Sequence, residues 1–224
     1  MKKKVLFLIV LLLAVSITTA CNSSKKEIGK KFKKEYEALN GKKNSMGKEH
    51  RTITIDEDNP YEKVTQKDVV EMISSDKTFY LYVGDPLCPW CRSVLEKSIE
   101  QAKKHKVEKI YYIDIWDKDG NEILRDKYEL KDNVVTKVQK GTEEYEKLLE
   151  YFDSVLKDYT LKDENGNEIQ VGEKRIYAPN FFYIEEGDVK KMITGVSEKQ
   201  KDAREELTKE ILEDEEKQFD EFFK

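Results

Sequence analysis

Two cysteines, Cys88 and Cys91, are the residues of this chain best suited to chemistry. They form the motif Cys-Pro-Trp-Cys, which follows an apolar run at residues 79–83 and precedes a helical pattern. A cysteine at the start of a helix faces unpaired N–H groups and the positive end of the helix dipole, and both favour the thiolate. The motif therefore predicts thiol–disulfide exchange, with Cys88 as the nucleophile and Cys91 as the residue that resolves the mixed disulfide.

The two residues between the cysteines fit this interpretation, and other uses of the pair fit less well. Pro89 suits the first turn of a helix, and Trp90 is expected to point outward and contact a substrate. A zinc site usually adds a second cysteine pair or nearby histidines, but His50 and His105 are not at ligand spacing, so we expect no metal and no cofactor. A purely structural disulfide is unattractive because closing so short a loop removes little chain entropy.

The pattern of apolar residues predicts the elements that position the motif. Apolar runs and alternation predict strands, at residues 51–55, 79–83 and 109–115. Helical periodicity and capping signals predict helices, at residues 28–39, from Thr65, from Cys88, at 121–130, at 145–159 and at 203–212. Turn signals predict hairpins, at residues 160–171 and 180–194. This order predicts an α/β fold, with a central mixed sheet flanked by helices.

With these elements in place, the chain resembles the thioredoxin superfamily over about residues 51 to 213. The segment Ala178-Pro179, followed by an apolar strand, is similar to the cis-proline segment that lies beside the two cysteines in that family. The resemblance implies a thioredoxin-like fold and pairing of the substrate backbone with Ala178. The sequence of residues 84–92 is similar to that of bacterial thioredoxin-like proteins called bacteriocin transport accessory proteins.

Two features depart from a minimal thioredoxin. Many thioredoxins carry a buried carboxylate six residues before the first cysteine, where it moves protons for the second, and here that residue is Tyr82. Proton transfer is therefore expected to be slower or to pass through water. The stretch between Ile115 and Pro179 is also longer than the fold needs, which predicts a helical and hairpin insertion at about residues 116–175, before the cis-proline strand.

The N-terminus has the layout of a secretory signal, with Lys2–Lys4, an apolar run at residues 5–15 and small residues before Cys21. The run is shorter than the ~20 residues that a membrane span needs. It resembles a bacterial lipoprotein signal, although Thr18 stands where such signals usually carry Leu, Ile or Val; the alternative is ordinary secretion with an incidental Cys21. The expected parts are a signal at 1–20, a tether and helix at 21–50, and a thioredoxin-like domain at 51–224.

The composition of the chain limits the classes of partner that we expect. The chain has 41 Lys and Arg against 46 Asp and Glu, and removing the three signal lysines leaves 38 against 46, a net charge of −8. Because both signs are interspersed and no basic patch stands out, nucleic-acid binding is not expected. Lipid on Cys21 would leave Cys88 and Cys91 as the only pair of thiols, whereas an oxidising compartment usually recruits scattered disulfides. The close pair therefore indicates that the pair itself is the function.

Two functions remain open at this stage. The first is an extracytoplasmic thiol–disulfide oxidoreductase, anchored by lipid to the outer face of a bacterial cytoplasmic membrane. It would act on the thiols and disulfides of exported proteins and be recharged by a membrane redox partner. The alternative is a surface-tethered binding or accessory module with little redox activity, whose insertion docks a partner. Whether an enzyme of this kind oxidises, reduces or isomerises depends on its reduction potential.

Overall fold

The computed structural model describes residues 26–116, 124–132 and 134–224. At its centre lies a five-stranded mixed sheet in the order β1-β3-β2-β8-β9. The strands are β1 (Tyr61–Lys63), β2 (Phe79–Gly84), β3 (Ile110–Asp114), β8 (Asn180–Glu185) and β9 (Asp188–Ile193). Strands β1 and β2 run parallel to β3, whereas β8 is antiparallel to both β2 and β9. The predicted α/β class with a central mixed sheet is confirmed.

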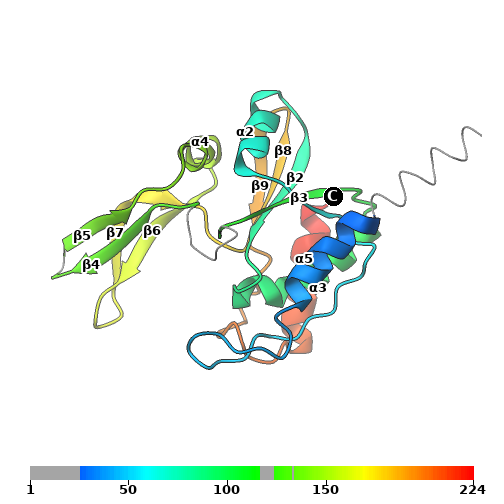
Figure 1. Cartoon of the computed structure of the whole chain (residues 1–224), viewed down its shortest axis with the longest axis horizontal. Helices are drawn as coiled ribbons and strands as arrows, with labels where there is room; N and C mark the ends of the chain where they lie inside the picture. The colour runs from blue at the N-terminus through cyan, green and yellow to red at the C-terminus, as the bar shows by residue number, and fades with distance from the viewer. Residues whose placement is uncertain (1–25, 117–123, 133) are drawn as a thin grey trace, which may run out of the picture.

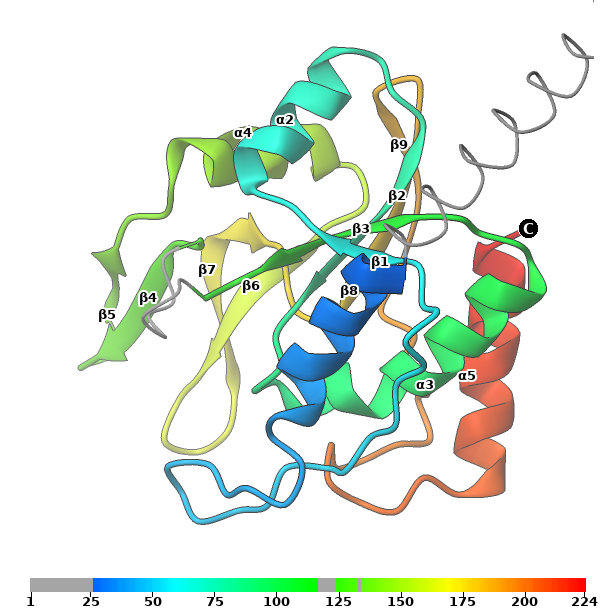
Figure 2. The same cartoon turned by 45° about the vertical axis from the view of Figure 1, so that its right-hand side comes forward.

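Helices cover both faces of this sheet (Figures 1 and 2). One face carries α3 (Pro89–Lys104), α5 (Lys209–Phe222) and the N-terminal helix, whose described part covers residues 26–37. The other face carries α2 (Gln66–Ser74) and α4 (Glu143–Phe152). Two hydrophobic clusters result, one around Tyr82, Cys91 and Phe219 and one around Leu81, Phe152 and Phe182. Strand β2 is buried on both faces, which explains why its sequence is apolar without alternation.

Threonine side chains start three of the helices. Thr65, Thr142 and Thr208 each accept a hydrogen bond from the backbone N–H three residues later. At α2 the Asp68 carboxylate also accepts from the Thr65 N–H, at 2.8 Å, which completes the predicted capping box. The last helix was expected from about residue 203, but α5 begins only at Lys209, because the Thr208 cap sets its start.

The described residues of the region predicted as an insertion form one helix and two hairpins. The hairpins are β4 (Lys127–Lys131) with β5 (Val134–Gln139), and β6 (Lys157–Lys162) with β7 (Glu168–Arg175), and they project together from the body (Figure 1). Helix α4, by contrast, lies on the sheet, where Phe152 stacks on Phe182 of β8 with ring centroids 4.2 Å apart. The prediction of a helix at 121–130 is wrong for residues 127–130, which belong to strand β4; residues 121–123 lie outside the described part.

The prediction of a strand at residues 51–55 is also wrong. Ile53 and Ile55 are buried alternately, as a strand would bury them, but no strand in the described part of the chain pairs with them. Side chains of the N-terminal segment take that place. The Asn40 amide bonds both the C=O of Ile53, at 2.8 Å, and its N–H, at 3.2 Å, while the Glu37 carboxylate accepts from the Ile55 N–H at 2.7 Å. The segment is therefore extended without belonging to a sheet.

The anchoring predictions fall outside what the structure describes. Cys21 and the signal-like residues before it precede residue 26, where the description begins. Within the described ranges, no helix combines the length and apolar character needed to cross a bilayer.

Candidate active site

The cysteine pair lies where β2 ends and α3 begins. Cys88 is the N-cap of α3, and its sulfur accepts a hydrogen bond from the Cys91 N–H at 3.3 Å. Pro89 is the first residue of the helix, where its missing N–H costs nothing. Both sulfurs are free thiols. The predicted context, a buried strand leading directly into a helix that starts at Cys88, is thus present.

The two thiols have different environments. Cys88 is partly exposed and Cys91 is fully buried. A hydrogen bond from the Cys91 thiol lowers the pKa of Cys88, and backbone N–H groups of Cys91 and Trp90 add to this against the opposing effect of burial. Burial, and then the neighbouring Cys88, raise the pKa of Cys91 well above the ordinary range. The geometry therefore favours a thiolate at Cys88 and a protonated thiol at Cys91.

The proline segment from the far end of the chain meets this pair. The Ala178–Pro179 bond is cis, and the Cys88 thiol donates to the Ala178 carbonyl at 3.5 Å. Residues Leu87, Cys88, Pro89, Trp90 and Ala178 all keep some exposure. Trp90 is half-buried, so part of this residue stays accessible next to Cys88 in the chain. Within the described ranges, the structure thus brings together the six site residues predicted from the sequence, and Cys21 lies outside those ranges.

Tyr82 occupies the position in β2, six residues before Cys88, where many thioredoxins carry a buried carboxylate. Its ring is fully buried, and its hydroxyl lies 3.1 Å from the Tyr36 hydroxyl of the N-terminal helix. A hydrogen bond from this hydroxyl slightly favours the Cys91 thiolate. Burial raises the pKa of Tyr82 well above its usual value, so the phenol donates a hydrogen bond and does not act as a base. Gly84 is required here, because a Cβ on it would lie 2.1 Å from the Tyr82 ring.

Asp85 is a site residue that the sequence analysis missed. Its side chain is 3% exposed; Oδ1 accepts from the Leu87 N–H at 2.7 Å and its backbone carbonyl accepts from the Cys88 N–H at 3.1 Å. Burial raises the pKa of this carboxyl to about 7, and its charge in turn raises the pKa of Cys88. A buried acid that titrates near neutral pH beside a reactive thiol is a candidate for proton exchange. In the sequence, Asp85 has the pattern of an ordinary turn residue, because it stands directly before Pro86.

Asp85→Asn provides a test of this role. Removing the charge should lower the pKa of Cys88, so its alkylation by iodoacetamide should proceed at lower pH than in the wild type. The folded pKa of Asp85 exceeds the ordinary 3.8, so the native state keeps a proton that the unfolded chain releases. Stability should therefore fall as pH rises from about 4 to about 7 in the wild type, and less so in Asp85→Asn.

The matched control is Asp188→Asn, which removes an exposed carboxylate from the start of β9. It should leave both the alkylation profile of Cys88 and the pH dependence of unfolding unchanged. An Asp85→Asn protein whose two profiles coincide with those of the wild type would contradict the assignment.

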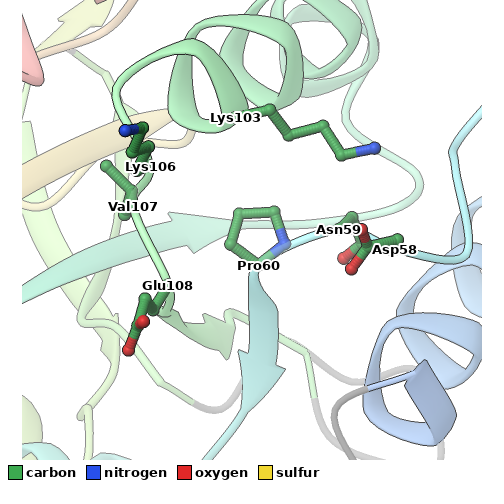
Figure 3. Close-up of a pocket in the computed structure, with 7 residues that line it drawn as sticks. All are labelled: Asp58, Asn59, Pro60, Lys103, Lys106, Val107 and Glu108. Atoms are coloured by element: carbon green, nitrogen blue, oxygen red, sulfur yellow. The ribbon is translucent and has the colours of Figure 1, made fainter. Parts of the chain in front are cut away.

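A separate hollow lies at the other end of α3 and gives no comparable site (Figure 3). Its walls are Asp58, Asn59, Pro60, Lys103, Lys106, Val107 and Glu108. Lysine and acidic side chains balance there, and the Lys103 ammonium is already 2.6 Å from the Asp56 carboxylate. In the described ranges, no group of three or more His, Cys, Asp and Glu side chains is placed to hold a metal ion.

Comparisons with known proteins add little beyond the geometry. No protein-family model matches the chain, and a search of curated proteins finds no significant match. Among solved structures, thioredoxin O2 from Arabidopsis thaliana, in its oxidized state, is similar with 12% identity and a TM-score of 0.33; the match covers 62% of this chain and 85% of that one. The sheet order, the helix that starts at Cys88 and the cis-proline at 179 are the features that give this chain a thioredoxin-like fold.

Proposed function

We propose that this protein is a thiol–disulfide oxidoreductase that works through Cys88 and Cys91. The observation that carries the proposal is the asymmetry of the pair. Cys88 is partly exposed at a helix N-terminus with a lowered pKa, whereas Cys91 is buried with a raised pKa. An attacking thiol needs access and thiolate character, while a resolving thiol needs to stay protonated and close until the mixed disulfide has formed.

The exchange proceeds in two displacements. The Cys88 thiolate attacks one sulfur of a substrate disulfide, which forms a mixed disulfide and releases the first substrate thiolate. Cys91 then gives up its proton and attacks the Cys88 sulfur, which forms the Cys88–Cys91 disulfide and releases the second substrate thiolate. We assign Asp85 as the acceptor of that proton, because its carboxyl is buried with a pKa of about 7 and its backbone carbonyl accepts a hydrogen bond from the Cys88 N–H at 3.1 Å. The reverse sequence oxidises a substrate dithiol, and the reduction potential decides the net direction.

Substrate alignment falls to the cis-proline segment in this proposal. Ala178 offers its backbone to an extended substrate chain, next to the Cys88 sulfur, and Pro179 follows it at the start of β8. Pro89 and Trp90 follow Cys88 directly and are partly exposed, so they would contact the same substrate chain. The partly exposed Trp90 ring supplies apolar contact to whatever chain carries the substrate cysteines.

A thiol titration tests the proposal. The rate of iodoacetamide modification, followed by mass spectrometry, should show Cys88 modified first, with a pKa below that of an ordinary cysteine. The reason is that a hydrogen bond from the Cys91 thiol, and then the backbone N–H groups at the helix start, stabilise its thiolate. Titration against glutathione should show a two-electron transition of the same pair. The alternative function, a binding module whose projecting hairpins dock a partner, would be favoured by an unreactive Cys88 with a high pKa.

The proposal includes placement outside the cytoplasm. The signal-like residues 1–20 and Cys21 support lipidation, as in bacterial thioredoxin-like lipoproteins, and two acyl chains on Cys21 would anchor the protein stably. Its substrates would then be exported proteins, with a membrane redox partner to recharge the pair. Resemblance to bacteriocin transport accessory proteins at residues 84–92 is the support for a more specific role in export.

Cys21→Ala tests the anchor in a bacterial host that processes lipoproteins. We expect the protein to leave the membrane fraction or to accumulate with its signal uncleaved, because no acyl chains can be attached. Cys21→Ser, which also lacks the thiol, should behave in the same way. Normal processing and detergent-requiring membrane retention in both variants would show that something other than lipid on Cys21 holds the protein there.

A further inference from the structure

The three residues that precede the substrate-aligning Ala178 are all held by the inserted segment. Arg175, Ile176 and Tyr177 connect the end of β7 to the cis-proline turn. Each of them makes at least one hydrogen bond or ring contact to residues between Arg125 and Thr160. The next residue, Ala178, places its carbonyl 3.5 Å from the Cys88 sulfur. Residues 175–177 thus connect the insertion to the site, and each of the three contacts the insertion.

Ile176 is held from both sides of its peptide backbone. Its side chain is fully buried; its N–H donates to the Tyr145 hydroxyl of α4 at 3.4 Å, and its carbonyl accepts from the Arg125 guanidinium at 3.4 Å. Tyr145 is 1% exposed, so its hydroxyl is not exchanging this contact for bulk water. Both partners come from the insertion, one from its helix and one from the segment before β4.

The neighbours of Ile176 are fixed in the same way. The Arg175 guanidinium donates to the Asp126 carbonyl at 3.1 Å and lies 4.2 Å from the Tyr159 ring centroid. Tyr177 donates its hydroxyl to the Asp158 carbonyl at 3.3 Å. Asp126 is itself anchored, because its carboxylate accepts from the Gly141 N–H at 2.6 Å and pairs with Lys137 of β5 at 2.8 Å. Both hairpins are therefore linked to this stretch.

We infer that the inserted segment is a positioning element that sets where the Ala178 backbone lies relative to Cys88, and thereby sets the affinity for extended polypeptide substrates. The inference rests on the proposed function. A small disulfide needs only the Cys88 sulfur, whereas a polypeptide also pairs with the Ala178 backbone. Loosening residues 175–177 should therefore weaken polypeptide binding and leave exchange with a small disulfide intact.

Tyr145→Phe tests the inference with minimal change, because it removes one hydroxyl and keeps the buried ring. We expect KM for a reduced or disulfide-bonded polypeptide such as insulin to rise roughly two- to tenfold, as the loss of one hydrogen bond allows. The rate with hydroxyethyl disulfide and the pH profile of Cys88 alkylation should stay as in the wild type. Tyr151→Phe is the matched control: Tyr151 lies on the same helix and is 39% exposed, and its hydroxyl bonds that of Ser74 on the neighbouring helix at 3.0 Å, away from residues 175–177.

Arg175→Gln provides a second, larger perturbation, since it removes both the bond to Asp126 and the ring contact. Its KM for the polypeptide should rise further than that of Tyr145→Phe. Unchanged KM in both variants overturns the inference, and so does an equal loss of rate with polypeptide and small disulfide, which would indicate general damage to the site. A wild-type protein that is inactive with both substrates would instead overturn the proposed function, and the inference with it.

Discussion

Replacing Cys88 with serine should reduce catalysed insulin reduction by more than about a thousandfold, to the rate of the reductant alone. The hydroxyl stays protonated at neutral pH and cannot form the mixed disulfide that begins the exchange. The same substitution at Cys91 should act differently. The first attack by Cys88 remains possible, but without a resolving thiol the mixed disulfide with the substrate should accumulate.

These two variants control each other, since they differ only in which end of the motif has lost its sulfur. Nonreducing electrophoresis with mass spectrometry should show a covalent complex of Cys91→Ser with its substrate and none of Cys88→Ser. Circular dichroism should show both variants folded. Full insulin-reducing activity in Cys88→Ser would contradict the assignment of Cys88 as the nucleophile.

Arg92→Leu should lower the free energy of unfolding by about 3–5 kcal/mol, the largest stability effect that we expect from a single substitution. The Arg92 side chain is 1% exposed, and its guanidinium makes four hydrogen bonds. The partners are the carbonyls of Arg51, Tyr36 and Pro86, at 2.8, 2.8 and 3.3 Å, and the Asn40 amide oxygen, at 2.7 Å. Leucine would fill part of the volume but remove the charged donor from all four of these acceptors, and leucine offers no hydrogen bond in its place.

The measurement is urea unfolding followed by circular dichroism, with Lys97→Leu as the control on the same helix. Lys97 is partly exposed, and its ammonium pairs with the exposed Glu100 carboxylate at 2.7 Å, so its loss should cost less than about 1 kcal/mol. Because Arg92 also holds the Pro86 carbonyl beside the cysteines, the variant should lose exchange activity below the unfolding midpoint as well. An Arg92→Leu protein as stable as Lys97→Leu would show that its bonds contribute little net free energy.

Much of the fold could be predicted because its strongest signals are local. The apolar run at residues 79–83 is long enough only for a buried strand, and the capping box at Thr65 and Asp68 forms as predicted. The two cysteines could be identified from their residue type and spacing. The proline at 179 could be identified from the apolar strand that follows it. Each of these inferences needed only neighbouring residues and the periodicity of one element.

The failures came where distant residues decide the outcome. Ile53 and Ile55 alternate like a strand, but the polar side chains of Glu37 and Asn40 satisfy their backbone instead of a neighbouring strand. Asp85 is a common turn residue in sequence, and only burial by the surrounding elements raises its pKa to about 7. Arg92 follows the motif directly, yet nothing in its neighbourhood in sequence indicates that it holds three separate segments together.

The sheet order also determines when the active site is completed as the chain folds. Strand β2 pairs with β3 after one helix, but its other edge pairs with β8, where Phe79 meets Ile184 across a loop of about 100 residues. Closing that loop is costly in entropy, so the β2–β3 half with α3 can form well before β8 arrives. In that interval the buried cluster that contains Cys91 lacks Phe181, and the edge of β2 is open. The thiol that is most secluded in the native protein is therefore accessible to oxidants during folding.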